Sequence, residues 1–313
     1  MLRLSIILLI TLGRPHQARA AVERTVEKTF IVAAGVTLKL DTCHGAIRIE
    51  PSTDNHLQVL VRETMNVPTE DDADRLQHHL NLTFEQTPAQ VSIKARFKRS
   101  VRWAWESWPP VALAYAIKLP RDSHLKLTTA EGDITVCSLK GNVQARAGNG
   151  AIFTGDINGS VSATSTRGDL SVTACTGPLT LSAQQGNVLV GRAHGITKIN
   201  AADGTIEVQN ARGPLFIKAD AADIKVGFPH PLLAPAELRA DGGDIEALFD
   251  PRCAANLDAH ASTFGEVKVK NLALKIESGK PGTSRVRGTL NGGGPKLLLK
   301  ASGGNIRLTG LEP

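Results

Sequence analysis

Long hydrophobic runs are missing from this chain after its first twenty residues. A helix that crosses a bilayer needs about 20 consecutive apolar residues. The sequence therefore predicts a mature chain without a transmembrane segment, either soluble or attached peripherally to a membrane. Strong net charge is missing too, because the whole chain carries a formal charge of +6. Such a mild excess does not indicate a nucleic-acid partner, and we expect none.

Motifs that carry catalytic or metal chemistry are also missing. The chain contains no Gly-x-Ser-x-Gly elbow, no His-Glu-x-x-His pair and no phosphate-binding P-loop. Its four cysteines, Cys43, Cys137, Cys175 and Cys253, show neither a Cys-x-x-Cys pair nor another zinc-ligand spacing. The sequence predicts no metal and no cofactor. It leaves the disulfide pairing open, although Cys137 and Cys175 fall at different phases of a repeat and are expected not to pair.

The first twenty residues have the pattern of a secretory signal peptide. Arg3 precedes an apolar run from Leu4 to Leu12, and Ala18-Arg19-Ala20 forms a cleavage site of the A-x-A type. Removal of residues 1–20 takes away three arginines and no acid, which leaves a formal charge of +3. We therefore expect an exported protein, periplasmic or at the cell surface, in a compartment that permits disulfides.

Ten glycines stand nine residues apart in the middle of the chain. They are Gly132, Gly141, Gly150, Gly159, Gly168, Gly177, Gly186, Gly195, Gly204 and Gly213. A fixed short period over about a hundred residues is typical of a solenoid, whose repeats stack on their neighbours. We interpret each glycine as a structural turn residue that needs either positive φ or close backbone packing.

Each repeat places a pair of apolar residues after its glycine. Gly168-Asp-Leu170-Ser-Val172 is one example, and alternation at period two turns both apolar side chains to one face of a short strand. Alternate units differ in character, since the odd ones follow Gly-Asp-Ile-x-Val more closely than the even ones. The sequence therefore predicts an all-β, single-stranded β-solenoid. Its 18-residue coil has two strands and two turns, so that residues 18 apart stack.

Two other kinds of coil with 18 residues fit the pattern less well. A triangular hexapeptide helix requires an aliphatic residue every six positions, whereas the apolar pairs here recur every nine. A calcium-binding nonapeptide roll requires Gly-Gly-x-Gly-x-Asp turns. In this chain Asp133 and Asp169 directly follow their glycines instead.

The chain divides into three segments. Residues 1–20 form the signal peptide, residues 21–124 a strand-rich N-terminal section, and residues 125–313 the solenoid, which is regular to about residue 226. The N-terminal section contains one short helix over about residues 70–80, with Thr69 as its N-cap and acids in its first turn. After residue 226 the pattern predicts longer coils and insertions.

The turn and core residues resemble those of the bacterial putative-adhesin domain family, whose function is not established. The similar motifs are Phe30-x-Val32-x-x-Gly35, Tyr115-x-Ile117-x-Leu119-Pro120 and Gly303-Gly-Asn-Ile306-x-Leu308. The resemblance covers nearly the whole mature chain. It implies a β-solenoid related in shape to pectin-lyase-type helices, without accepted catalytic residues, and it leaves the ligand open.

A polysaccharide hydrolase or lyase of the β-helix type would place carboxylates on neighbouring coils of one outer face. The position after each odd glycine is occupied in turn by Asp133, Ala151, Asp169, Asn187, Thr205 and Asp223. We find no adjacent pair of carboxylates in this column. We interpret its Asp and Asn side chains as turn residues that accept hydrogen bonds from backbone N–H groups.

The repeat pattern fails over residues 98–110, which contain all three tryptophans. Trp103, Trp105 and Trp108, together with Arg102, could form an aromatic, cationic surface that binds sugars or an anionic polymer. The same residues could instead cap the open end of the solenoid, where unpaired strand edges would otherwise be exposed.

The sequence favours an exported, non-catalytic β-solenoid that acts as an adhesin-like binding or scaffold module at the cell envelope. Its expected partner is a surface polysaccharide or an envelope protein. A carbohydrate-active enzyme is the alternative, and a structural spacer without a ligand is a third hypothesis. A face covered with Thr, Ser and Asn would favour binding, whereas three acids or an Asp/Arg/Lys cluster in one outer groove would favour the enzyme.

Overall fold

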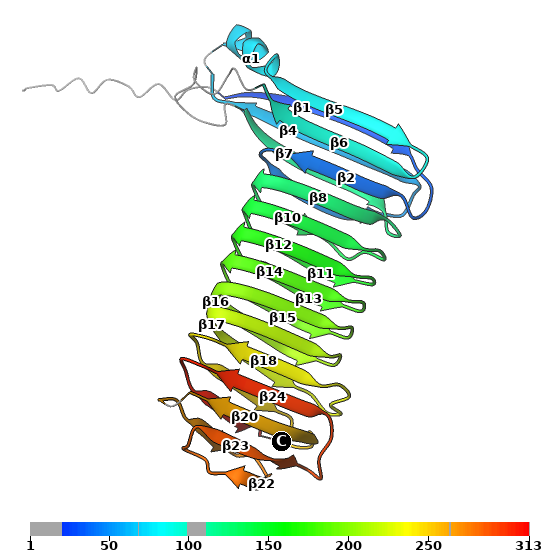
Figure 1. Cartoon of the computed structure of the whole chain (residues 1–313). Coiled ribbons are helices and arrows are strands. Elements are labelled where there is room, and N and C mark those ends of the chain that lie inside the picture. The colour runs from blue at the N-terminus through cyan, green and yellow to red at the C-terminus, as the bar shows by residue number, and fades with distance from the viewer. Residues whose placement is uncertain (1–20, 68, 99–110, 263, 313) are drawn as a thin grey trace, which may run out of the picture.

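Strands dominate the structure and wind into one elongated stack (Figure 1). The computed structural model describes residues 21–67, 69–98, 111–262 and 264–312. The predicted signal peptide and the tryptophan-rich segment, with Arg102, Trp103, Trp105 and Trp108, therefore lie outside the described residues. Within the described part, 25 strands and one α-helix form, which confirms the all-β prediction.

The strands form two layers, whose inward-facing side chains meet in a shared core. In stacking order, layer 1 contains β5 (Leu80–Thr87), β6 (Gln90–Phe97), β2 (Thr37–Thr42), β8 (His124–Glu131), β10 (Val143–Asn149), β12 (Val161–Arg167), β14 (Leu179–Gln185), the first halves of β16 (Thr197–Ala211) and β17 (Leu215–Phe228), β18 (Ala236–Ala240), β24 (Lys296–Ala301), β20 (Ala255–Ala261), β23 (Arg285–Leu290) and β22 (Leu274–Gly279).

Layer 2 is built in the same way. In stacking order it contains β1 (Val22–Ile31), β4 (His56–Met65), β7 (Val111–Pro120), β3 (Ala46–Ser52), β9 (Ile134–Val136), β11 (Ile152–Ile157), β13 (Leu170–Cys175), β15 (Val188–Ala193), the second halves of β16 and β17, β19 (Ile245–Phe249), β25 (Ile306–Gly310) and β21 (Val267–Lys270). Each regular coil therefore contributes one strand to each layer, which confirms the predicted two-strand coil.

Residues 18 apart stack through the regular part of the chain, as the glycine period predicts. Val143 pairs with Val161 in layer 1, and Ile152 pairs with Leu170 in layer 2. The register continues through β17. It lengthens at the next coil, where Leu215 pairs with Ala236, because the loop between β17 and β18 is longer than the earlier turns.

The core is a ladder of aliphatic side chains. In layer 2 it runs through Ile134, Ile152, Leu170, Val188, Ile206 and Ile224, each at most 1% exposed. Burial of one such side chain stabilises the fold by about 1.5–3 kcal/mol. Each side chain is buried only because the coils on both sides of it are in place, so neighbouring coils depend on one another.

One polar residue interrupts the adjacent ladder of valines. Thr154 pairs with Val136 on one side and Val172 on the other, is 3% exposed, and its Oγ1 has no hydrogen-bond partner in the structure. A buried hydroxyl without a partner costs about 1–3 kcal/mol. We therefore expect Thr154→Val to raise the free energy of unfolding by about 1 kcal/mol or more, measured by urea denaturation. An unchanged or lower stability would contradict the unpaired state of this hydroxyl.

The glycine columns permit a close approach between coils. A Cβ atom on Gly168 would lie 2.3 Å from the carbonyl oxygen of Gly150, and Gly168 has a φ of +137°. On the opposite edge, a Cβ on Gly195 would lie 2.3 Å from the oxygen of Gly177, without positive φ. The sequence suggests two reasons for these glycines, positive φ and close backbone packing. Both apply at Gly168, whereas close packing alone applies at Gly195.

The N-terminal section joins the same stack. β2 pairs with β8, and β3 pairs with β9, in parallel register. Beyond them the stack ends in antiparallel pairs, β5 with β6 in layer 1 and β1 with β4 in layer 2. The stack therefore crosses residues 124 and 125 without a break, and the division of the chain into two sections at this point stays a proposal.

The C-terminal coils do not stack in chain order. β24 lies between β18 and β20, and β25 lies between β19 and β21. Figure 1 shows β24, near the red end of the colour scale, inserted between these earlier strands. The last two strands of the chain therefore lie inside the stack, between strands that precede them in the sequence. The end of layer 1 is formed by β22 and β23.

Candidate binding surface

The polar residues that follow the odd glycines form a hydrogen-bond ladder along one edge. Asp169 Oδ1 accepts the backbone N–H of Asn187 at 2.7 Å, and Asn187 Oδ1 accepts the N–H of Thr205 at 3.0 Å. Asp133 accepts the N–H of Ala151 in the same way. Each side chain thus satisfies a turn N–H of the next coil, which confirms the interpretation made from the sequence.

The same edge contains one adjacent pair of carboxylates that was not predicted from the sequence. The expectation of no adjacent acids is wrong beyond Asp223, because the longer loop after β17 places Asp244 on the next coil. The N–H of Asp244 donates to Asp223 Oδ1 at 2.8 Å. Asp244 itself accepts the N–H of Asn305 at 2.8 Å and pairs with Arg307 at 2.9 Å. Both carboxylates therefore take part in the ladder.

The ladder makes a direct prediction about Asp169. Asp169→Ala removes the acceptor for the Asn187 N–H and should lower the free energy of unfolding by about 1 kcal/mol. Asp169→Asn keeps an acceptor oxygen and should leave stability within about 0.5 kcal/mol of the original. Urea denaturation of the two variants compares them. Equal destabilisation by both would show that the negative charge, and not the acceptor, matters here.

The remaining sequence candidates are easily placed. All four cysteines, Cys43, Cys137, Cys175 and Cys253, are free thiols, so Cys137 and Cys175 do not pair, as expected. Over the described ranges, no group of three or more His, Cys, Asp or Glu side chains could hold a metal ion. The one described helix is too short to span a bilayer. The tryptophan-rich segment lies outside the described residues, so the role of its aromatic side chains stays a prediction.

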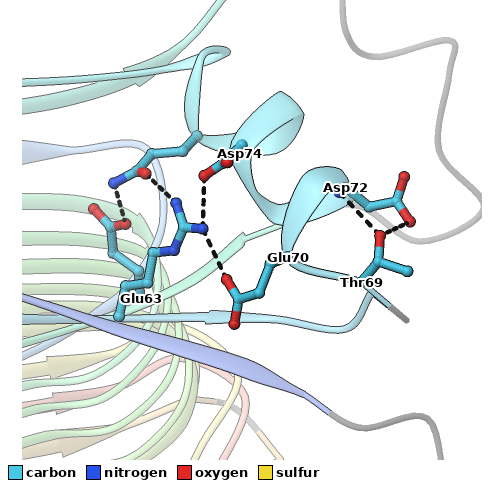
Figure 2. Close-up of polar contacts among 7 residues, drawn as sticks. Glu63, Thr69, Glu70, Asp72 and Asp74 are labelled. Carbon is cyan, nitrogen blue, oxygen red and sulfur yellow. Dashed lines mark hydrogen bonds and ion pairs between the residues drawn. The ribbon is translucent and has the colours of Figure 1, made fainter.

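A polar cluster fixes helix α1 (Glu70–Gln77) to the N-terminal end of layer 2 (Figure 2). Arg24 on β1 pairs with Glu70 at 3.0 Å and with Asp74 at 2.7 Å. Gln77 donates to Glu63 at 3.2 Å, and burial raises the pKa of the Glu63 carboxyl. Thr69 accepts the N–H of Asp72, as expected of the N-cap. This cluster lies at one end of the stack, and its charged side chains are paired with one another.

The outer face of layer 1 carries a strip of uncharged polar side chains, which we call the hydroxyl–amide strip. It consists of two neighbouring columns, Gln144, Ser162 and Thr180 in one and Thr164, Ser182 and Asn200 in the other. All six side chains are exposed or half-buried. Within the described structure, none of them forms a hydrogen bond with another side chain or with the backbone. Their donors and acceptors are therefore available to a ligand.

A cationic groove continues this face toward the N-terminus. It has a volume of about 210 Å³ and is lined by Lys39, Asp41, Lys126, Thr128, Gln144 and Arg146, together with Leu40 and Leu127. A second groove, of about 370 Å³, shares Lys126 and Gln144 with it and reaches Ser162. The cationic groove and the hydroxyl–amide strip are thus continuous across β2, β8, β10 and β12.

Layer 2 also has grooves, in which some of the charges are paired. One, about 530 Å³, lies over β1, β3, β4 and β7, where Arg48 and Glu50 form an ion pair at 2.7 Å. Its lining also includes Glu27, Lys28 and Lys118, which form no ion pair within the described residues. Another, about 510 Å³, lies beside the exposed side chain of Leu189 and is lined by Arg192. Arg192 faces Asp156 across 3.8 Å. The cationic groove of layer 1 differs from these, because its unpaired charged side chains, Lys39, Lys126 and Arg146, are all positive.

The family profile described as Toastrack DUF4097 matches residues 116–309. This chain belongs to the Toastrack DUF4097 family. The matched range runs from within β7 to within β25 and so includes the hydroxyl–amide strip. Membership in the Toastrack family confirms the family resemblance of the turn and core motifs, and these motifs are structural and specify no ligand.

Two solved structures align with this Toastrack protein over most of its length. One is a putative adhesin from Bacteroides fragilis, with 10% sequence identity and a TM-score of 0.46, covering 92% of this chain and 97% of that chain. The other is a putative cell adhesion protein from Clostridium sporogenes, with 10% identity and a TM-score of 0.24, covering 92% of this chain and all of that chain. A search of curated proteins finds no match.

Proposed function

We propose that this Toastrack protein is an exported, non-catalytic binding module of the cell envelope, periplasmic or at the cell surface, that engages a surface polysaccharide through the outer face of layer 1. The signal-peptide pattern of residues 1–20 supports export. The observation that carries the binding role is the hydroxyl–amide strip. Its six unpaired side chains match the hydroxyl groups of a sugar polymer in hydrogen-bonding capacity.

The geometry of the strip suits an extended ligand. Side chains in one column repeat at the strand spacing of about 4.8 Å, and the two columns run side by side on the outer face of layer 1. A linear polymer that lies along the stack could therefore contact several coils with equivalent groups. Weak contacts repeated along a polymer add to a useful affinity because the later contacts form within the same complex.

A glycan-binding screen of the mature protein tests this proposal. We expect binding of at least one envelope polysaccharide, and we expect Ser162→Ala/Thr164→Ala/Thr180→Ala/Ser182→Ala to weaken it on the order of tenfold. The matched control is Thr135→Ala/Ser171→Ala/Thr173→Ala on layer 2, which should bind as the original protein does. The proposal would be contradicted if both variants lost the same affinity, or if the original protein bound none of the glycans.

The aromatic hypothesis has its own arm in the screen. Trp103→Ala/Trp105→Ala/Trp108→Ala should weaken binding if these residues contact the ligand, which is one of the two roles that the sequence leaves open for them. If the strip variant loses affinity and the tryptophan variant does not, then layer 1 alone carries the interaction. If only the tryptophan variant loses affinity, the layer 1 proposal is wrong.

A carbohydrate-active enzyme is the alternative, and the adjacent carboxylates of Asp223 and Asp244 are the observation that favours it. Release of reducing ends or unsaturated products from a bound polysaccharide would support this alternative. Asp223→Asn/Asp244→Asn should then abolish the release while binding persists. We expect no release from the original protein, since each carboxylate already accepts a backbone N–H of the ladder.

A further inference from the structure

The cationic groove has a charge pattern that the uncharged strip beside it lacks. From this pattern we infer that the groove binds the carboxylates of an acidic, uronate-containing polysaccharide. The inference rests on the proposed function, because it specifies the ligand class of the same face. The two surfaces share Gln144, but the variants that test them change different residues, so the two can fail separately.

Two lysines are direct neighbours in the groove. Lys39 on β2 and Lys126 on β8 are partners in register, which places their Cα atoms about 5 Å apart. Like charges directly opposite each other destabilise a sheet. Neither lysine forms an ion pair with any residue that the structure describes. A bound anion between them would remove the repulsion.

Among the described residues that line the groove, the one acid, Asp41, is already neutralised. Asp41 pairs with Arg96 at 2.5 Å, and its neighbours in register are Lys94 and Thr128. Arg146, two strands from Asp41, extends the positive charge along the groove and forms no ion pair within the described ranges. The groove therefore presents Lys39, Lys126 and Arg146 to solvent without compensating acids.

The other end of the same face also carries neighbouring cations, but most of them have acidic partners. Near the C-terminus, Lys218 pairs with Asp220 at 3.3 Å, and Arg239 pairs with Glu237 on its own strand. Asp258 accepts Arg285 at 3.2 Å. Lys218, Arg239 and Lys300 are neighbours in register, but acids pair with the first two, so less positive charge is left uncompensated here than in the cationic groove.

The donors of the groove favour carboxylates on a glycan over phosphate groups. Phosphate sites in proteins commonly use clusters of free backbone N–H groups or bidentate arginine pairs. The backbone N–H groups here are used in the parallel ladder, as in the donation from Leu125 to Asn142. The groove offers separate ammonium groups beside the hydroxyl of Thr128 and the amide of Gln144, an arrangement that fits alternating carboxylate and hydroxyl groups.

The size of the surface suits several sugar rings. The groove and its continuation cross β2, β8, β10 and β12, a distance of about 14 Å at the usual strand spacing. A monosaccharide would contact only part of this length. The geometry thus points to a short stretch of a linear acidic polymer that runs along the stack and continues onto the hydroxyl–amide strip.

The test is a titration with polygalacturonate, with its methyl ester as the uncharged form of the same backbone. We expect binding of the acid, on the order of tenfold weaker binding of the ester, and a similar loss in Lys39→Gln/Lys126→Gln. The control Lys218→Gln/Lys300→Gln removes the same charge from the other end of the face and should bind within about twofold of the original. Thermal unfolding checks the fold, and relief of the lysine repulsion should leave stability unchanged or higher.

Three results would overturn the inference. They are an unchanged affinity in Lys39→Gln/Lys126→Gln, equal loss in the control variant, and binding of inorganic polyphosphate as tight as that of the acid polymer. If neutral glycans still bind and respond to the strip variant, the proposed function stands while this inference fails. If no glycan of either kind binds, both fail.

Discussion

Gly168→Ala should destabilise the protein by about 3 kcal/mol or more, because two costs coincide at this position. The new Cβ would lie 2.3 Å from the carbonyl oxygen of Gly150, and the residue has a φ of +137°. The oxygen is backbone, so it moves only if the whole neighbouring coil moves. Urea denaturation followed by circular dichroism measures the loss.

Gly155→Ala is the matched control, since Gly155 lies one coil earlier and outside the glycine column. Its nearest atom to a new Cβ is the Ser138 nitrogen at 3.1 Å, and its φ is not in the left-handed region. We expect a change within about 1 kcal/mol, because alanine also loses less conformational entropy than glycine. Comparable stability of the two variants would refute the steric explanation of the glycine column.

A chain that ends at Gly294 should lose far more structure than the strands it lacks. The deletion removes β24 and β25, and with them Leu297, Leu299, Ile306 and Leu308, each fully buried. Their burial contributes roughly 6–12 kcal/mol. Because these strands lie between β18 and β20 and between β19 and β21, β20 to β23 lose their connection to the stack.

Hydrogen exchange read by mass spectrometry distinguishes this outcome from simple end fraying. Amides of residues 255–290 should exchange rapidly in the shortened chain, while the coils up to Val226 keep their protection. A chain that ends at Leu311 is the control and should exchange as the full chain does. Full protection of residues 255–290 after the deletion would contradict the inserted position of β24 and β25.

The regular coils were predictable because one chemical rule repeats in them. Each glycine permits close stacking, and each apolar pair after it faces the core, so Leu170 and Val172 predict their own partners 18 residues away. The same rule predicted that turn acids such as Asp169 accept backbone N–H groups. A local pattern that repeats also specifies the contacts between repeats.

The C-terminal order was not predictable from the period. After β17 the loop that contains Pro229 and Pro235 changes the register, and β20 to β23 intervene before the chain returns with β24. The apolar pattern of β24 fits beside β18 as well as it would fit at the end of the stack. For the same reason the proximity of Asp223 and Asp244 could not be seen.

The sequence predicted what type of surface would indicate binding, but it did not predict which residues form that surface. We expected a binding face to be covered with Thr, Ser and Asn. The 18-residue register predicts that Thr164 and Asn200 lie in one column of such a face. The lysine pair does not follow from it. Lys39 lies in an N-terminal strand far from Lys126 in sequence, and only the pairing of β2 with β8 brings them together.

Lysine labelling with an amine-reactive ester, in the presence and absence of polygalacturonate, is the most direct test of the claim that layer 1 is the binding face. Mass spectrometry should show Lys39 and Lys126 protected by the polymer. Lys118, on the outer face of layer 2, and Lys300, near the C-terminal end of layer 1, should react as before. Protection of Lys118 with none at Lys39 and Lys126 would contradict the account.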